Sequence, residues 1–340
     1  MLNRIIEGGD LSTQEAEDLM RSMMDEELTP VQLGAFLVAL RAKGETVDEV
    51  VGFARAMRAR ARQLPTTRQL ADTCGTGGDN RGTFNISTAA ALIVAACGQP
   101  VAKHGNRAAS GKCGSADVLE AVGVDVALPP TGVTECIDRA GIGFLFAPAF
   151  HPATKFAVMP RRELGVRTVF NLLGPLTNPA RPSYQLLGVS NESLLDLMAQ
   201  VLLKLGVVRA LVVHSEDGTD EISVACSTLV REVVDGEVNA YQLAPEDFGV
   251  ARSAPDAVRG GDPETNAAIL RDVLAGMPGA TRDAAIINAA AALYASGRSA
   301  GFADGARQAA SAIDAGAAAA ILERLREASQ GARARIESVA

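Results

Sequence analysis

The stretch Asp72-Thr73-Cys74-Gly75-Thr76-Gly77-Gly78-Asp79 follows a short predicted strand and precedes a predicted helix at 86–97. Three glycines within four residues allow backbone N–H groups to converge on an anion without interference from Cβ atoms. Asn85, Ser87 and Thr88 lie where that helix begins, and free N–H groups and the helix dipole favour phosphate there. Taken without the other motifs, the loop could equally be a tight turn with only a structural role. The pattern is neither a Walker A motif nor GxGxxG, so ATP and NAD are not the first candidates.

A second polar element, Lys103-His104-Gly105-Asn106-Arg107, directly follows a predicted strand at 100–102. It places two permanent cations and a histidine at the carboxyl end of a strand, where open α/β sheets bind ligands. Ser115 lies shortly after it and begins a predicted helix at 115–122. A lone cation is usually solvated surface. Next to a glycine-rich loop, however, this element indicates a binding site for a phosphorylated small molecule.

A third element, His214-Ser215-Glu216-Asp217-Gly218-Thr219-Asp220-Glu221, follows a predicted strand at 210–213. It contains four carboxylates within six residues. Magnesium usually takes one or two carboxylates together with substrate phosphates. A solvated acidic loop is the alternative for this segment alone. Beside a phosphate site, it predicts the residues that hold a metal ion.

Strands and helices alternate over most of the chain after residue 69. Short apolar runs predict strands at 100–102, 143–146, 184–189 and 210–213. Helices are predicted at 86–97, 115–122, 131–140, 193–205, 264–275, 282–296, 303–313 and 317–329. The alternation predicts an α/β fold with a central, mostly parallel sheet. Apolar runs at 222–224, 229–234 and 238–243, the last two flanking Asp235-Gly236, indicate antiparallel strands instead.

The first 65 or so residues predict three short amphipathic helices. Ser12 with Glu15 and Thr46 with Glu49 form capping boxes, and Thr29-Pro30 supplies an N-cap followed by proline. Such helices bury too little surface to form a core alone. We expect them to pack on another domain, on a later helix or on a second subunit.

Composition limits the possible functions. The net charge of −8 disfavours broad attraction to nucleic acid or to an anionic membrane, and no long apolar window predicts a membrane span. The beginning of the chain lacks the apolar stretch of a signal peptide. The five cysteines include no CxxC pair, which favours a reducing, cytoplasmic environment over a disulfide framework.

Several longer motifs resemble the anthranilate phosphoribosyltransferase family, in order and spacing, over about residues 3–328. They are Gly75-Thr76-Gly77-Gly78-Asp79, Thr83-Phe84-Asn85-Ile86-Ser87-Thr88, Lys103-His104-Gly105-Asn106-Arg107, Gly114-Ser115-Ala116-Asp117-Val118-Leu119-Glu120, Arg167-Thr168-Val169-Phe170-Asn171-Leu172-Leu173-Gly174-Pro175-Leu176-Thr177-Asn178-Pro179 and Asp220-Glu221. The resemblance implies transfer of a phosphoribosyl group from phosphoribosyl pyrophosphate to the amine of anthranilate. Pyrophosphate is released in this early step of tryptophan biosynthesis.

The resemblance also implies a role for each matching residue. Those implied to bind the phosphoribosyl donor are Gly75, Thr76, Gly77, Gly78, Asp79, Thr83, Asn85, Ser87, Thr88, Lys103 and Ser115. Those implied to line the anthranilate site are Gly75, His104, Asn106, Arg161 and Gly174, and those implied to hold Mg²⁺ are Ser87, Asp220 and Glu221. Lys103 and His104 are the candidate catalytic residues. Lys103 would stabilise the departing anion, and His104 would accept a proton or only shape the site.

The resemblance further implies a helical domain at about 1–67, completed by a segment near 160–182, and an α/β domain formed by 68–159 and 183–340. The active site would lie in the cleft between them, and the helical domain would form a homodimer. A pyrimidine nucleoside phosphorylase shares the fold and a glycine loop, but its pattern lacks the Asp220-Glu221 pair. A non-catalytic relative that binds nucleic acid is the other alternative, which the net charge of −8 disfavours.

Overall fold

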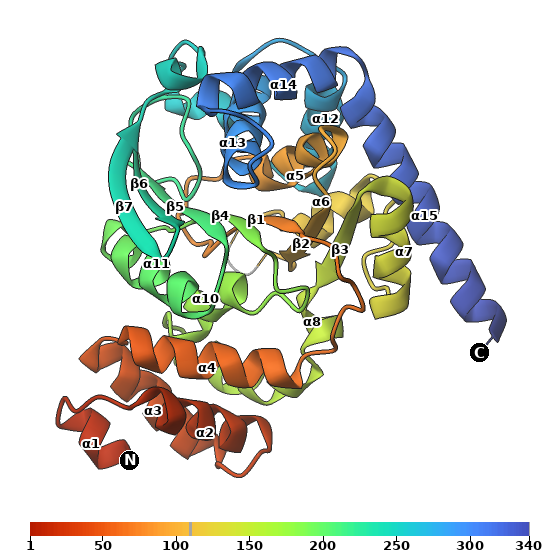
Figure 1. The fold of residues 1–340 in the computed structure, drawn as a ribbon. Helices are drawn as coiled ribbons and strands as arrows, with labels where there is room; N and C mark the ends of the chain where they lie inside the picture. The colour runs from red at the N-terminus through yellow and green to blue at the C-terminus, as the bar shows by residue number, and fades with distance from the viewer. Residues whose placement is uncertain (109–110, 340) are drawn as a thin grey trace.

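The structure, a computed structural model, describes residues 1–108 and 111–339 and contains one seven-stranded sheet (Figure 1). The strands are β1 (Ala71–Gly75), β2 (Val101–Gly105), β3 (Ile142–Phe146), β4 (Tyr184–Gly188), β5 (Arg209–Ser215), β6 (Thr228–Val234) and β7 (Glu237–Leu243). Their order is β3-β2-β1-β4-β5-β6-β7. Neighbours from β3 to β5 are parallel, whereas β6 and β7 add an antiparallel hairpin. The predicted mostly parallel sheet is confirmed.

The prediction of a strand at 222–224 is wrong, because the structure has no strand there. Ile222 donates its backbone N–H to Asn288 Oδ1 at 3.0 Å and accepts from Asn288 Nδ2 at 2.9 Å. A buried helical side chain therefore pairs both backbone groups that a neighbouring strand would otherwise pair. The segment consequently needs no place in the sheet.

The amino-terminal helices begin largely where their capping residues predict. They are α1 (Leu2–Ile6), α2 (Thr13–Met24), α3 (Pro30–Lys43) and α4 (Val47–Arg60). All three predicted caps are present, because Ser12, Thr29 and Thr46 each accept from the backbone N–H three residues later. The short α1 was not predicted. A helical unit thus precedes the sheet domain.

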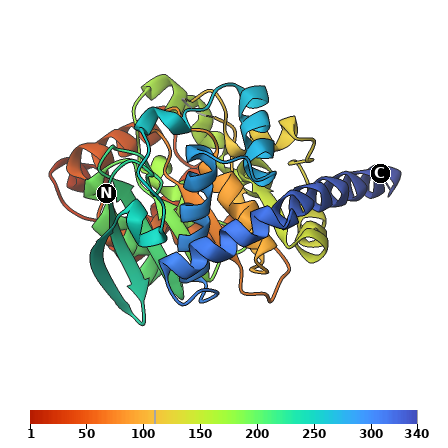
Figure 2. The same ribbon diagram turned by 90° about the horizontal axis from the view of Figure 1, so that it is seen from above.

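The remaining helices cover the sheet and link its strands. They are α5 (Ile86–Ala96), α6 (Ser115–Ala121), α7 (Pro130–Ala140), α8 (Ala147–Phe150), α9 (Val158–Leu164), α10 (Phe170–Leu173), α11 (Leu195–Lys204), α12 (Pro263–Leu274), α13 (Ala280–Ala295), α14 (Phe302–Asp314) and α15 (Ala317–Val339). Helix α15 runs beyond the predicted end at 329 and projects from the body of the molecule (Figures 1 and 2). Within the described residues, no helix combines the length and apolar character needed to cross a membrane.

The two faces of the sheet belong to two hydrophobic clusters. Leu186 on β4 and Leu211 on β5 pack with residues of α5 and α13 on one face. Their neighbours Leu187 and Val212 point to the opposite face and pack with α11, α10 and the amino-terminal helices. This alternation follows from the two-residue repeat of a strand. Strands buried on both faces explain the near-continuous apolar runs in the sequence.

The order of the strands creates a change of direction at β1. The chain proceeds from β1 outward to β2 and β3, and then returns to place β4 on the other side of β1. Because these strands are parallel, their carboxyl ends lie along one edge of the sheet. Open α/β sheets bind ligands outside these ends, at the point where the order reverses. The glycine-rich loop after β1 lies at that point.

A buried polar network ties β1 to β2 and to the segment before β4. Asp72 on β1 is fully buried, and its carboxylate accepts from His104 N at 3.2 Å and Asn178 Nδ2 at 2.9 Å. Asn178 Nδ2 also donates to Ala102 O at 2.8 Å. Burial raises the pKa of Asp72, so these donors are needed to offset the loss of water.

We predict that Asn178→Ala lowers the free energy of unfolding by about 1–3 kcal/mol, since it leaves the buried Asp72 carboxylate and Ala102 carbonyl without this donor. Urea unfolding midpoints would measure the change. Asn239→Ala, at an exposed position on β7, is the matched control. Equal effects of the two substitutions would contradict the assigned importance of the network.

Candidate active site

The loop after β1 passes close to the acidic segment that follows β5. Gly77 donates its backbone N–H to Asp220 Oδ2 at 2.8 Å. A Cβ atom at Gly75 would collide with the same carboxylate, and one at Gly188 would collide with the Asp220 backbone. Thr76 N donates to Gly188 O at 2.9 Å, which fixes the loop to the end of β4. The glycines therefore permit an acidic residue to approach the backbone of both central strands.

Arg167 holds the loop from the other side. Its Nη1 donates to Gly77 O at 3.1 Å and to Gly78 O at 3.2 Å, whereas its Nη2 is buried without a partner in the described structure. Gly77 and Gly78 have φ angles of +64° and +76°, which favour glycine. Arg167 begins one of the sequence motifs, but the sequence alone indicated no role for it. Its unpaired donor is available to an anionic ligand in the loop.

Lys103 lies inside β2 rather than after it, which corrects the predicted end of that strand. The side chain is 2% exposed, and Nζ donates to Thr73 O at 2.6 Å and to Ser87 Oγ at 3.3 Å. Thr73 Oγ1 in turn donates to Ser87 O at 2.8 Å. These bonds bring a buried cation to the first turn of α5, directly beside the glycine loop.

Three carboxylates gather opposite this cation. Burial, followed by the negative charge of Asp79, raises the pKa of Asp220. Burial and Asp220 raise the pKa of Glu221, against the opposing effect of Lys103. Asp79 Oδ2 is buried and has no hydrogen-bond partner among the residues described. Each raised pKa reflects first the burial of the carboxylate and then the negative charges beside it, and a bound cation would stabilise the charged forms.

The donor set fits magnesium better than zinc. In residues 1–108 and 111–339 there is no group of three or more His, Cys, Asp or Glu side chains arranged to hold a metal ion. Magnesium does not need such a cage, because it retains waters and takes one or two carboxylates plus substrate phosphates. Asp220 and Glu221 can supply the carboxylates, and Ser87 lies close to both Lys103 and Glu221.

The four carboxylates of the acidic segment have different surroundings. Asp217 accepts from Ser223 Oγ at 2.7 Å and from Thr219 N at 3.0 Å, so it shapes the turn. Glu216 is exposed to solvent. Asp220 contacts the glycine loop directly through Gly77 N, and Glu221 lies beside Asp220, with Asp79 and Lys103 among the charges that act on it.

The start of α5 is organised by side-chain bonds. Asn85 does not cap the helix with its side chain. Its Nδ2 instead donates to Cys113 O at 3.2 Å, and its Oδ1 accepts from Asn266 Nδ2 at 2.8 Å. Asn266 is 2% exposed, and no sequence motif indicated its role. Asn85 therefore bridges the loop before α6 to the first turn of α12.

The other predicted donor residues surround this point. Ser115 Oγ donates to Asn106 O at 3.3 Å. Thr83 forms a bridge with Arg259, a contact that sequence reasoning missed. Thr88 is 1% exposed, and its Oγ1 lacks a partner within the described chain. Thr83 therefore lies in the loop before α5, whereas Thr88 and Ser115 lie in the first turns of α5 and α6.

His104 lies at the end of β2 and faces the segment that contains Gly174. Its Nδ1 lies 3.0 Å from Gly174 O, so Nδ1 carries the proton and Nε2 presents a lone pair. Nε2 is buried and unpartnered in the residues described. Burial, followed by repulsion from His151, lowers the pKa of His104 to about 3. The ring is therefore neutral at pH 7. His151, 5.3 Å away between ring centroids, was not predicted.

Arg161 projects from α9 toward α10. Its guanidinium carbon lies 5.1 Å from the centroid of the Phe170 ring, and burial lowers its pKa. It forms no ion pair within the described residues, whereas the adjacent Arg162 is exposed. Stacking on an aromatic ring keeps the cation ordered without neutralising it. Gly174 follows α10, so Arg161 and Gly174 are linked through one short segment rather than by direct contact.

Comparisons with known proteins agree on one family. Residues 1–61 match the model of the helical bundle domain of a glycosyl transferase family, and residues 67–319 match that of its a/b domain. The chain is 52% identical over 335 residues to an anthranilate phosphoribosyltransferase of Symbiobacterium thermophilum, covering 98% of each sequence.

Solved structures of relatives have the same fold. An anthranilate phosphoribosyltransferase from Thermus thermophilus superposes with a TM-score of 0.92 and 46% identity, covering 97% of this chain and 99% of that one. A Saccharomyces cerevisiae enzyme of that name, in complex with PRPP and Mg, has a TM-score of 0.87 and 26% identity, with 94% of each chain covered. The chain therefore belongs to the anthranilate phosphoribosyltransferase family, whose members join a helical bundle to an a/b glycosyl transferase domain.

Proposed function

We propose that this enzyme transfers the phosphoribosyl group of phosphoribosyl pyrophosphate to the amine of anthranilate. The observation that carries the proposal is the meeting of a glycine loop, buried Lys103 and the Asp220-Glu221 pair at the reversal of strand order. A phosphate-bearing donor needs backbone N–H groups and cations, and magnesium needs the carboxylates. This part of the site holds opposite charges side by side, as a magnesium–pyrophosphate group requires.

The donor occupies the loops after β1 and β2. The glycine backbone from Gly75 to Asp79 faces the diphosphate, together with Asn85, Thr88 and Ser115 around it. Ser87, Asp220 and Glu221 hold Mg²⁺, which neutralises the diphosphate and supports its departure when it is bound. Support comes from Arg167 Nη2 and Asp79 Oδ2, two atoms of opposite charge at the loop that are buried without a partner among the described residues.

The reaction breaks the bond between ribose C1 and the pyrophosphate oxygen, and pyrophosphate departs with the electron pair. The anthranilate nitrogen forms the new bond to C1 and loses one proton. Positive charge grows on the ribose and negative charge on the leaving group. Lys103 and the loop N–H groups lie where that negative charge appears and stabilise it. Because anthranilate carries a neutral amine at pH 7, positioning does much of the remaining work.

His104 provides the acceptor for the amine. Its Nδ1 is committed to Gly174 O, so only Nε2 can accept an N–H hydrogen bond. A pKa of about 3 keeps the ring neutral and the lone pair free. An aryl amine that has bonded to C1 becomes strongly acidic, and a weak base is then sufficient to take its proton. The segment from Arg161 to Gly174, with Asn106, forms the anthranilate side of the site, where Arg161 pairs with the carboxylate.

We infer a homodimer formed by the helical unit. Most of the exposed large hydrophobic residues lie there or on α9, among them Ile6, Val31, Val38, Val158 and Met159. Apolar surface gathered on short helices marks an interaction site. The proposed domains remain 1–67 with 160–182, and 68–159 with 183–340. The five free cysteines are compatible with the proposed cytoplasmic location.

The protein is expected to consume anthranilate only when phosphoribosyl pyrophosphate and magnesium are both present. Loss of anthranilate fluorescence measures the reaction continuously. Omission of either component is the internal control. An unchanged signal at every magnesium concentration would contradict the proposed activity.

The double substitution Asp220→Asn with Glu221→Gln is expected to lower turnover roughly a hundredfold or more, since the site loses both carboxylates that hold the cation. Magnesium titrations of the initial rate would show the loss of metal dependence. Glu216→Gln removes an exposed carboxylate of the same segment and is the control. Comparable losses in both variants would exclude a specific metal role.

Arg161→Ala is expected to raise the KM for anthranilate roughly tenfold or more, while the KM for the donor changes less than about twofold, because a charge-assisted bond to the carboxylate is lost. Arg162→Ala, on the same turn but exposed, should leave both values near those of the wild type. A rise in the donor KM alone would reassign Arg161 to phosphate binding.

A further inference from the structure

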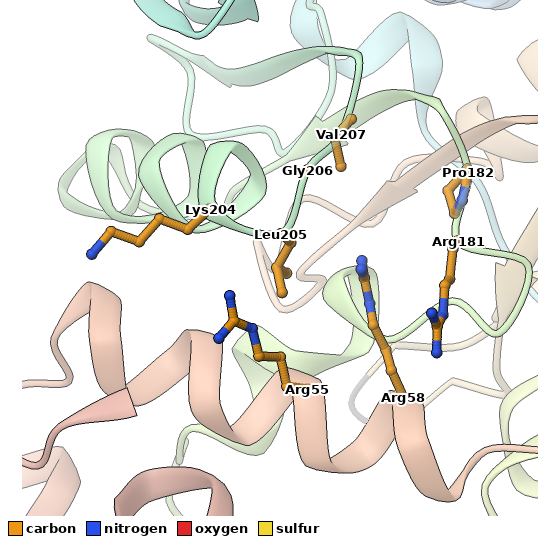
Figure 3. Close-up of a pocket in the computed structure, with 8 residues that line it drawn as sticks. All are labelled: Arg55, Arg58, Arg181, Pro182, Lys204, Leu205, Gly206 and Val207. Carbon is orange, nitrogen blue, oxygen red and sulfur yellow. The ribbon is translucent and has the colours of Figure 1, made fainter. Parts of the chain in front are cut away.

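A basic pocket lies between the helical unit and the α/β domain, on the side opposite to the active site. Its volume is about 370 Å³, and its lining comprises Arg55, Arg58, Arg181, Pro182, Lys204, Leu205, Gly206 and Val207 (Figure 3). Arg181 and Pro182 immediately precede β4, and Val207 precedes β5. The pocket is therefore at the amino ends of parallel strands, whereas the candidate active site is at their carboxyl ends.

Arg58 is the buried cation of this pocket. It projects from α4 toward Arg181 and is only 8% exposed (Figure 3). Its Nε donates to Leu176 O at 2.7 Å, which leaves both terminal nitrogens without a protein acceptor among the described residues. Burial, followed by repulsion from Arg181, lowers the pKa of Arg58 to about 10. Burying a cation against another cation is unfavourable unless an anion accompanies them.

The neighbouring Arg55 and Arg181 differ from Arg58 in being exposed to solvent. Across the described part of the chain, neither Arg55 nor Arg181 forms an ion pair with a carboxylate, whereas Arg21, Arg60, Arg231 and Arg282 each do. Lys204 differs, because its Nζ bonds to Asp48 Oδ1 at 2.7 Å and points away from the others (Figure 3). Arg58 and Arg181 therefore lie side by side with no carboxylate bonded to either among the described residues, whereas Arg55 lies apart from them on α4 (Figure 3). Arg55 has a carboxylate nearby, because the pKa of Asp48 is lowered first by Lys204 and in part by Arg55.

The backbone at Arg181 supports a role beyond packing. Its φ angle of +46° lies in the left-handed region, which is costly for a residue with a long side chain. The conformation directs the Arg181 side chain down toward Arg58 (Figure 3). A bound anion would offset both the cost of this backbone conformation and the repulsion between Arg58 and Arg181.

We propose that this pocket binds a phosphorylated small molecule with an uncharged body. Guanidinium groups match the geometry of phosphate oxygens, and the adjacent Arg58 and Arg181 suit a dianion, with Arg55 as a further cation of the lining. The volume exceeds that of a bare phosphate and falls within the range of small-molecule sites. Pro182, Leu205 and Val207 form an apolar wall that inorganic phosphate would not use. The ligand would join α4 to the segments before β4 and β5, and so stabilise the junction of the two domains.

The test compares the wild type with Arg55→Gln/Arg181→Gln in magnesium-free buffer with EDTA, at ionic strength held constant with potassium chloride. Both residues are exposed enough to be replaced without creating a cavity. Calorimetry and thermal unfolding are measured with phenyl phosphate, inorganic phosphate and citrate as probes. We expect phenyl phosphate to bind the wild type most tightly and to raise its unfolding midpoint. Its apparent Kd should be at least tenfold weaker in the double variant.

Arg60→Gln is the matched control, because Arg60 is an exposed cation of the same helix that pairs with Asp25. It should keep a Kd within about twofold of the wild type, and the double variant should keep the wild-type KM for phosphoribosyl pyrophosphate. Equal binding by the double variant and the wild type would overturn the proposal. So would equal binding of citrate and phenyl phosphate, or a donor KM that rises together with the Kd.

Discussion

The close approach of Asp220 to the backbone of β1 and β4 is the constraint on which the site depends. The carboxylate bonds to the N–H of Gly77, and glycine at 75 and 188 leaves the space that it occupies. Any side chain at either position would displace the acidic segment. Because β1 and β4 are adjacent at the reversal of strand order, this one contact joins the glycine loop to the carboxylates proposed to hold the metal.

Two buried charged groups, the cation Lys103 and the carboxylate Asp72, lie next to this contact, and each has hydrogen-bond partners within the protein. Lys103 is held by Thr73 and Ser87, while Asp72 is held by Asn178 and the backbone of His104. Each group loses water on folding and regains fixed partners, which orders it before any ligand arrives. Among the buried atoms that have no hydrogen-bond partner in the described residues are Asp79 Oδ2, Arg167 Nη2 and His104 Nε2. These are the atoms to which the proposed reaction gives partners.

The two proposed anion sites lie at opposite ends of the parallel strands. At the carboxyl ends of the strands, cations and carboxylates alternate, which suits a magnesium-bound diphosphate. At the amino ends, Arg58 and Arg181 lie together with no carboxylate bonded to either in the described structure, which suits a phosphate without metal. Helix α4 packs against α11 and contributes to the second site, so a ligand there acts on the junction between domains.

The sequence by itself determined much of this protein. Capping boxes and proline positions gave the starts of α2 to α4, and apolar runs gave most strands, because these are local properties of neighbouring residues. Spacing of glycines, cations and carboxylates indicated a phosphate site with a metal. The apolar run at 222–224 predicted a strand that does not form, because the backbone of Ile222 bonds to Asn288, which is distant in the sequence.

Only the tertiary structure decided which members of each motif act together. It separated Asp220 and Glu221 from Asp217, which bonds within its own turn. It also brought in His151 and Asn266, and it assembled a basic pocket from three segments that share no motif. The physical reason is that burial, pairing and charge repulsion depend on distances between residues remote in sequence, which local patterns do not encode.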